Sequence, residues 1–268
     1  MSNVRLVTWN INSVRLRMPI VEQLVDEFSP DIISFQETKV QDDAFPRKKF
    51  EKLGYEHIYP FGQKGYHGVA TVSRIPLDGH EKHHWAGKDD TRHQSLILPG
   101  DVELHNFYVP AGGDIPDPDE NEKFAHKLQF LDEVTEWFTS RRNDGNKMIL
   151  VGDLNIAPAE ADVWSHKQLL KVVSHTPVEV ERMAKWYESH GFIDAVRQFI
   201  PEDEKVFSWW SYRSKDYRAN NRGRRLDHVW ATPAIMDAVK SINIHTDARG
   251  WVKPSDHVPI IFDMDLPA

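Results

Sequence analysis

The chain has 268 residues, a formal net charge of −8 and no cysteine. Disulfides and thiolate metal sites are therefore excluded, which fits a reducing compartment. No run of about 18 apolar residues occurs, so we expect no transmembrane helix. The first residues, MSNVRLVTWNIN, contain no apolar signal core, and this favours a cytoplasmic protein.

The negative net charge argues at first against a nucleic-acid partner, because phosphate binding usually requires a basic surface. The charge is uneven along the chain, however. The segment 207–228 contains six Arg or Lys residues and two acids, whereas the segment 114–122 contains five acids and no base. A site for a divalent cation also adds carboxylates. Net charge alone therefore excludes neither class of partner.

Eight short apolar runs, rich in β-branched or aromatic residues and bounded by turn formers, predict strands. They are Val4–Ile11, Asp31–Gln36, Gly68–Ser73, Gln94–Leu98, Val102–Val109, Lys147–Val151, Leu226–Ala231 and Val258–Met264.

Apolar residues at helical spacing predict helices over Pro19–Phe28 and Asn121–Arg142. A capping box at Thr176 predicts a third helix that ends at Gly191, and Thr232-Pro233 begins a fourth. The segment 110–120 reads as a surface loop.

Strands and helices that do not alternate regularly favour a four-layered α/β sandwich, with two packed mixed sheets flanked by helices. No linker divides the chain, so we expect one domain over residues 1–268. A doubly wound parallel sheet is the alternative. The segments LVTWNIN (6–12) and LVGDLNI (150–156) are both apolar and end in a similar way, which hints at two related halves.

Polar side chains follow the carboxyl ends of several predicted strands, where a rigid strand can direct them into a cleft. Each of them alone fits a turn or a helix cap equally well. As a set they have the carboxylates, amides and acid-paired histidine suited to metal-assisted attack of water on a phosphodiester. The set is Asn10, Asn12, Glu37, Tyr108, Asp153, Asn155, Asp227, Asp256 and His257.

The sequence resembles the exonuclease III family of abasic endonucleases, within the endonuclease/exonuclease/phosphatase superfamily. Eight blocks carry the resemblance, in order and over nearly the whole chain: TWNINSVRLR (8–17), PDIISFQETK (30–39), GYHGVATVSR (65–74), FYVP (107–110), VGDLNIAP (151–158), WWSYRS (209–214), RRLDHVWA (224–231) and KPSDHVPI (253–260). The resemblance implies a DNase I-like fold and a Mg²⁺-dependent enzyme, with Mn²⁺ as a substitute. It also implies cleavage of double-stranded DNA on the 5′ side of abasic sites, removal of 3′ blocking groups, and degradation of duplex 3′ ends.

Roles are implied residue by residue. Glu37 resembles the principal metal carboxylate, and the implied metal-binding set is Asn10, Glu37, Asp153, Asn155, Asp256 and His257. The implied catalytic set is Tyr108, Asp153, Asn155, Asp227 and His257. In that set Asp227 orients His257, Asp153 acts on the attacking water or on the leaving oxygen, and Tyr108 and Asn155 contact the phosphate.

The implied DNA-binding residues are Asn12, Trp209, Arg213 and Trp251, with Trp209 at a pocket for a sugar that lacks its base. Trp209 and Trp210 also read as core aromatics, and we expect Trp210 to be one. The basic run Arg213–Arg225 reads either as a phosphate-tracking surface or as a solvated loop.

Three residues depart from the family pattern: Ala111, Asp114 and Arg224. These departures bear on the affinity for duplex DNA and on the ratio of abasic incision to 3′-end trimming. The alternatives are a 3′-repair exonuclease with weak abasic activity, a nonspecific nuclease or a small-molecule phosphatase of the same superfamily, and a non-catalytic damage-binding protein. The resemblance favours a monomeric, cytoplasmic, nucleoid-associated enzyme of bacterial type.

Overall fold

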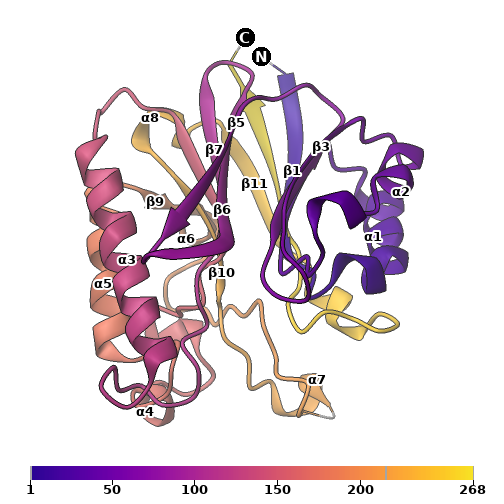
Figure 1. Cartoon of the computed structure of the whole chain (residues 1–268). Coiled ribbons are helices and arrows are strands. Elements are labelled where there is room, and N and C mark those ends of the chain that lie inside the picture. The colour runs from indigo at the N-terminus through magenta and orange to yellow at the C-terminus, as the bar shows by residue number, and fades with distance from the viewer. Residues whose placement is uncertain (1, 215, 268) are drawn as a thin grey trace.

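The computed structural model describes residues 2–214 and 216–267. Two six-stranded sheets pack face to face, and helices cover both outer faces (Figure 1). The predicted four-layered sandwich is therefore confirmed, and the doubly wound parallel sheet is wrong. The first sheet has the order β11-β12-β1-β2-β4-β3: Val239–Ile244, Ile260–Leu266, Ser2–Asn10, Ile32–Gln36, Val69–Ser73 and His57–Phe61. The second has the order β5-β6-β7-β8-β10-β9: Asp78–Trp85, Lys88–Leu98, Val102–Tyr108, Met148–Asp153, Asp227–Ala231 and Ile193–Asp194.

The helices form the outer layers. The helices α1 and α2 lie against the first sheet, and α3 and α5 lie against the second (Figure 1). Their bounds, with those of the four short helices, are Val14–Phe28 (α1), Arg47–Lys52 (α2), Glu122–Ser140 (α3), His166–Leu169 (α4), Pro177–Ser189 (α5), Ala195–Phe199 (α6), Tyr217–Asn220 (α7) and Pro233–Met236 (α8). No helix within the described ranges has the length and apolarity needed to cross a membrane.

The alternation of side chains along the central strands determines what faces the other sheet. In β1, Val4 and Leu6 enter the core between the sheets, whereas Val7 and Trp9 pack toward α1. Because alternate residues point to the same face, Asn10 continues the inter-sheet row. In β8, Ile149 and Val151 lie in the same core, so Asp153 faces the first sheet.

The two halves repeat a turn at this edge. The backbone N–H of Asn12 donates to Oδ1 of Asn10 at 3.1 Å, and that of Asn155 donates to Oδ1 of Asp153 at 2.9 Å. Asn12 and Asn155 both have left-handed backbones, with φ of 45° and 53°. Asparagine tolerates this conformation better than most residues. The similarity of the segments 6–12 and 150–156 thus corresponds to a repeated strand and turn.

The sequence prediction missed the peripheral strands β3, β5, β9 and β11, and it began β6 six residues too late at Gln94. Most of β5 is exposed, and β11 alternates only partly, so neither has a clear apolar pattern. Edge strands commonly carry charges that discourage pairing with other chains. The helix expected to begin at Pro19 begins at Val14 and keeps the proline inside. The surface loop 110–120 is confirmed.

Candidate active site

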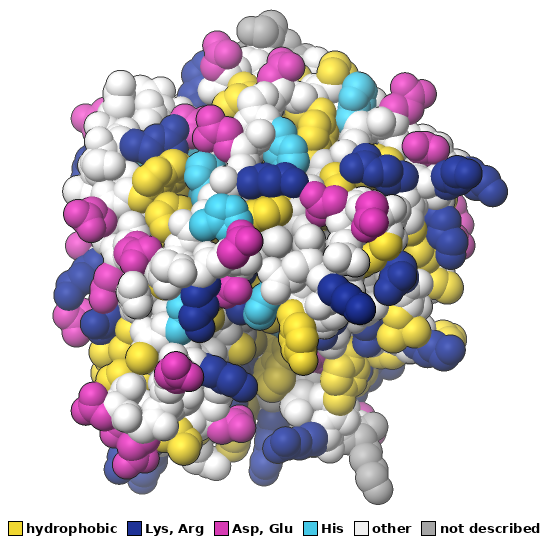
Figure 2. Space-filling view, in the orientation of Figure 1, with side chains coloured by type: hydrophobic (Ala, Val, Ile, Leu, Met, Phe, Trp, Pro, Cys, Tyr) yellow, Lys and Arg dark blue, Asp and Glu magenta, His cyan; other side chains and the backbone are white. Residues whose placement is uncertain are grey.

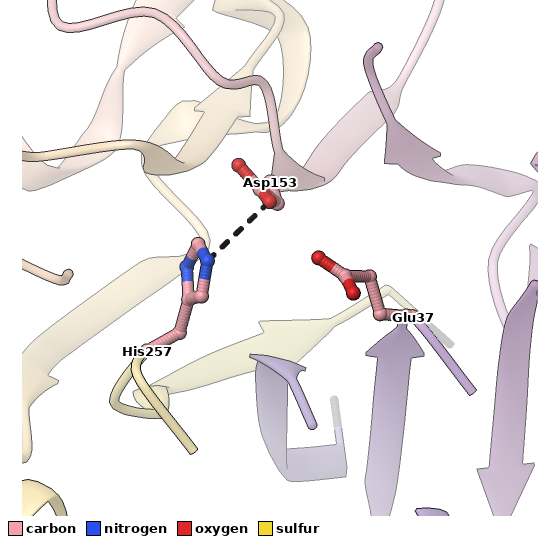
Figure 3. A group of neighbouring side chains, drawn as sticks. All are labelled: Glu37, Asp153 and His257. Carbon is pink, nitrogen blue, oxygen red and sulfur yellow. Dashed lines mark ion pairs between the residues drawn. The ribbon is translucent and has the colours of Figure 1, made fainter. Parts of the chain in front are cut away.

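The centre of the site is a group of three side chains contributed by both sheets. Ligand atoms of Glu37, Asp153 and His257 all lie within 4.8 Å of one another. Glu37 follows β2, Asp153 ends β8, and His257 precedes β12. Figure 3 shows the three side chains converging on one space, with Nε2 of His257 3.6 Å from Oδ2 of Asp153.

Asn10 lies at the centre of this group. Its amide nitrogen is 3.0 Å from Oε1 of Glu37, 2.8 Å from Oδ2 of Asp153 and 3.3 Å from Nε2 of His257. The side chain is fully buried. One amide from the first sheet therefore connects to a carboxylate of the second, which fixes the positions of the two acids relative to each other.

Local backbone geometry places the acids. Glu37 has a φ of 50°, which turns its side chain out of the regular alternation of β2. Gly152 precedes Asp153 with a φ of 137°, and a Cβ at this position would lie 2.0 Å from the carbonyl oxygen of Phe107. Only glycine fits this close approach of β8 to β7. Left-handed residues other than glycine cluster at functional sites because the surrounding structure must hold them.

Asp227 fixes the orientation of His257 from behind. Its Oδ2 lies 2.8 Å from Nδ1 of the imidazole and accepts a 2.6 Å hydrogen bond from the hydroxyl of Ser208. Asp227 is fully buried. A histidine bonded at Nδ1 presents Nε2 to the substrate in a fixed tautomer.

The pKa values reflect the concentration of negative charge. Burial raises the pKa of Asp153 to about 7, against the lowering effect of His257. Burial alone lowers the pKa of His257, but the carboxylates of Asp227, Asp153 and Asp256 outweigh it and raise this pKa to about 10. Burial also acts to raise the pKa of Glu37, yet Lys39 and the Asn10 amide lower it overall. Glu37 is therefore ionised and His257 is protonated at neutral pH.

A second hydrogen-bonded group borders the centre. The Asn12 amide donates to Oδ1 of Asp256 at 3.0 Å, and the Trp209 indole N–H donates to Oδ2 of the same carboxylate at 3.0 Å. Lys39 donates to Oδ1 of Asn12 at 2.6 Å and pairs with Glu37 at 2.7 Å. Asp256 is therefore tied to the centre through Asn12 and Lys39.

The remaining predicted residues lie at different distances from the centre. Asn155 donates to the Val109 carbonyl at 2.9 Å and to Oδ2 of Asp153 at 3.1 Å, so here it positions Asp153. Tyr108 is nearly buried, and burial followed by the Glu37 charge raises its pKa far above the usual value. Their roles as phosphate ligands stay predictions.

Arg213 and Trp251 have no hydrogen bond to the central group among the described residues. Arg213 is exposed, and Trp251 packs edge-on against Trp9 with 6.1 Å between ring centroids. Trp9 in turn donates its indole N–H to the His257 carbonyl at 3.0 Å. Trp251 is thus linked to the site through Trp9. The DNA-binding roles of Arg213 and Trp251 stay predictions. Trp210 is buried, as expected of a core aromatic.

Several contributors were missed from the sequence: Lys39, Ser208, Trp9 and Ser255. Ser255 donates to the Asn10 carbonyl at 2.6 Å and accepts from the His257 backbone N–H at 3.2 Å. Lys39 stands two residues after Glu37, and Ser208 precedes Trp209. Their closeness in sequence to Glu37 and Trp209 is the sequence feature that could have identified Lys39 and Ser208. Lysine and serine have no distinctive motif of their own here.

The donor set fits a hard divalent cation. Glu37 and Asp153 offer carboxylate oxygens from opposite sides, and Mg²⁺ typically uses one or two carboxylates with water and substrate phosphate. Nδ1 of His257 contacts Asp227, which leaves Nε2 toward the centre, and a hard cation such as Mg²⁺ prefers oxygen ligands to imidazole nitrogen. The oxygens of Glu37 and Asp153 are therefore the better candidates for holding a metal.

The model of the endonuclease/exonuclease/phosphatase family matches residues 7–257. The chain belongs to this family. It is also 30% identical over 271 residues to a Haemophilus influenzae protein named exodeoxyribonuclease III, covering 96% of this chain and 98% of that protein.

Two solved structures have the same fold over nearly their whole lengths. The structure of an AP endonuclease from Archaeoglobus fulgidus is similar to this chain, with a TM-score of 0.91 and 31% sequence identity. The match covers 98% of this chain and 100% of the Archaeoglobus chain. The 3′ phosphatase NExo from Neisseria, bound to a product DNA hairpin, has a TM-score of 0.88 and 30% identity, covering 98% and 99%.

Proposed function

We propose that this protein is a Mg²⁺-dependent DNA repair phosphodiesterase. It cleaves DNA on the 5′ side of abasic sites, removes 3′ blocking groups and degrades duplex 3′ ends. The observation that carries the proposal is the convergence of Glu37, Asp153 and His257 within 4.8 Å, bridged by Asn10. Family membership and the names of the relatives support the same chemistry.

Each central group has a role in the proposed reaction. Glu37 and Asp153 would hold Mg²⁺, with Asn10 and Asp256 supporting them. When bound, the ion supplies positive charge that polarises a phosphoryl oxygen. Asp153 would also accept the proton of the attacking water, through the carboxylate oxygen that faces His257.

Protonated His257 donates from Nε2 to an oxygen on which negative charge develops, while Asp227 holds the ring. The water oxygen bonds to phosphorus and the bond from phosphorus to the 3′ oxygen breaks. The 3′ oxygen takes up a proton, from His257 or from water, and becomes a hydroxyl, while the phosphate stays on the fragment that follows.

A second candidate is a 3′-repair exonuclease with weak abasic activity. Ala111 is exposed and carries no polar group for a phosphate, and Asp114 begins an exposed acidic loop. Charges of both signs are interspersed over the face seen in Figure 2. Duplex DNA would therefore be held less firmly than on a basic surface.

The test is incubation of the purified protein with an end-labelled duplex that contains one abasic site, with Mg²⁺, with Mn²⁺ or with chelator. A single metal-dependent cut 5′ of the lesion supports the abasic endonuclease. Stepwise shortening from the 3′ end alone favours the second candidate. Equal cutting of intact duplex identifies a nonspecific nuclease, and tight binding without cleavage identifies a binding protein.

A further inference from the structure

A groove of about 700 Å³ lies on the outer side of the second sheet, between α5, α6 and the loop that follows α6. In β10, Asp227 and Val229 point toward the first sheet, whereas Trp230 points outward and lines the groove. Alternate residues of a strand lie on opposite faces of the sheet. The second sheet therefore separates this groove from the Asp227–His257 pair.

One wall of the groove is apolar. Val180, Ala184 and Tyr187 lie at helical spacing along one side of α5 and line it. Ala184 is exposed, and Val180 and Tyr187 are partly exposed, so this wall is open to a ligand. Small-molecule sites commonly have volumes of about 300–1,000 Å³ and mostly apolar walls. The size of the groove and this wall fit a small organic molecule.

The rim of the groove carries acids that have no cation of their own. Glu202 and Asp203 line it and are exposed, and neither forms a salt bridge within residues 2–214 and 216–267. Glu160 also lines it, and its carboxylate lies 3.5 Å from a histidine, His166. Lys205 adds one positive charge to the same rim. Three acids against one lysine leave the rim with an excess of two negative charges.

The two arginines that line the groove do not change this excess, because buried carboxylates neutralise them. Arg225 pairs with Asp162 at 2.7 Å and with Asp194 at 2.7 Å. Arg197 pairs with the same Asp162 carboxylate. These two cations and two anions balance. A ligand cation would therefore be attracted to the rim, and a ligand anion would be repelled.

The loop that holds the rim acids is fixed in place. Nη1 of Arg197 donates to the Pro201 and Glu204 carbonyls at 2.7 and 2.9 Å, on either side of the two adjacent acids. The Arg197 side chain is only 8% exposed, so it is a rigid support. Burial raises the pKa of Tyr187, and the charge of Glu202 acts in the same direction. A rim charge therefore lies near the apolar wall, as a ligand with both features requires.

We propose that this groove binds a small organic cation. An ammonium or guanidinium group would lie against the rim acids, and an apolar body would lie against α5. None of the described residues that line the groove belongs to the catalytic set. The inference therefore goes beyond the proposed function and does not depend on it.

The test uses three probes that separate charge from apolar contact. Phenylethylamine has both features, phenylpropionate keeps the ring but reverses the charge, and ethylamine keeps the charge but lacks the ring. Backbone amide signals are followed by NMR titration at about 0.15 M salt, which screens distant charges. We expect phenylethylamine to bind with a Kd of about 1–10 mM, as its size allows. The other two probes should bind roughly tenfold more weakly or worse. The shifted signals should lie in α5 and in the segment 201–205.

Three variants test the two features of the groove. Glu202→Gln/Asp203→Asn should weaken phenylethylamine binding by roughly tenfold and remove its preference over phenylpropionate, because the remaining rim charges cancel. Asp119→Asn/Glu120→Gln is the matched control, since it removes two adjacent exposed acids that lie outside the groove. Ala184→Phe should fill the groove and block phenylethylamine. All these positions are exposed, so the melting temperature should stay close to that of the wild type.

The proposal is overturned if phenylpropionate or ethylamine binds within about threefold of phenylethylamine, less than one charge-assisted hydrogen bond would produce. It is also overturned if no signal in α5 or in the segment 201–205 shifts at about 20 mM phenylethylamine, above the expected Kd. Equal affinities in Glu202→Gln/Asp203→Asn and its control would have the same meaning. A protein that binds phenylethylamine as expected but cleaves no DNA would keep this inference and contradict the proposed function.

Discussion

Asp227 and His257 form a buried pair, with Oδ2 of the acid 2.8 Å from Nδ1 of the ring. The opposite ring nitrogen faces Asp153. The geometry is that of a carboxylate that orients and charges an imidazole, although the two residues come from different parts of the chain.

Replacing Asp227 with asparagine should lower kcat by about 100- to 10,000-fold, because an amide can stabilise the wrong tautomer. The pKa of His257 should also fall, since Asp227 is the charge that raises it most. Steady-state kinetics and NMR titration of the ring would measure both effects. Glu103→Gln is the control, because Glu103 pairs with His105 at 3.3 Å outside the site. Unchanged turnover in Asp227→Asn would show that the pair is only structural.

Glu37→Gln should remove most of the metal-dependent activity and weaken Mn²⁺ binding measured by calorimetry, because a neutral amide replaces the ionised carboxylate. Asp42→Asn provides a matched loss of charge, since Asp42 also pairs with a lysine, Lys82, at 2.8 Å. Equal metal affinity in Glu37→Gln and the wild type would remove Glu37 from the metal site.

The buried acid Asp162 should make stability depend on pH at the acidic end. Burial acts to raise its pKa, but Arg225 and Arg197 outweigh that effect and lower it from 3.8 to about 2. The ionised form thus contributes about 2 kcal/mol to the free energy of unfolding above pH 4, and this is lost as the pH falls toward 2.

Asp162→Asn should therefore unfold more easily at pH 7, by about 3 kcal/mol, because Arg197 loses its carboxylate partner and the buried Arg225 keeps only Asp194. It should also show a flatter decline in stability between pH 4 and 2. Denaturant unfolding at several pH values measures this. The control is Asp132→Asn, whose salt bridge with Arg182 is exposed. An identical acid decline in Asp162→Asn and the wild type would contradict the assignment.

Lys127 and Glu179 form a fully buried pair, with 2.5 Å between Nζ and Oε1, and Lys127 also donates to the Asn155 carbonyl at 2.8 Å. Lys127→Met should cost about 3–5 kcal/mol of stability, since it leaves a buried charge unpaired. The double variant Lys127→Met/Glu179→Gln should recover part of that loss. Lys185→Met, which breaks an exposed pair with Glu181, should leave the melting temperature nearly unchanged. A stable Lys127→Met would show that Glu179 is satisfied by its other donors.

The sequence was most informative where burial and regular alternation coincide. The central strands β1, β2, β7 and β8 were identified because they are short runs rich in apolar, β-branched or aromatic residues. The edge strand β5 was not, because most of its side chains are in water and leave no apolar pattern. Pro19 misled the prediction of α1, since proline usually begins a helix but lies inside this one.

For the site, the sequence predicted the residues better than their contacts. Asn10 and Asp153 could each be placed at a strand end, but their 2.8 Å contact depends on how two sheets pack. The resemblance supplied that juxtaposition. Trp9 was foreseen only as part of an apolar strand, although its indole N–H holds the His257 carbonyl.

The two sheets meet through a core that includes Leu104 and Ile149, and the site at its edge takes Asn10 from one sheet and Asp153 from the other. The separation of the two sheets should therefore affect the catalytic rate as well as the stability of the fold. A smaller side chain at Leu104, which lies far from the reacting atoms, would leave a cavity in this core. Asp153 and Glu37 could then move apart. A displacement of about 1 Å in a catalytic group can lower the rate roughly 100-fold. The kcat of such a variant would therefore report how closely the two sheets pack.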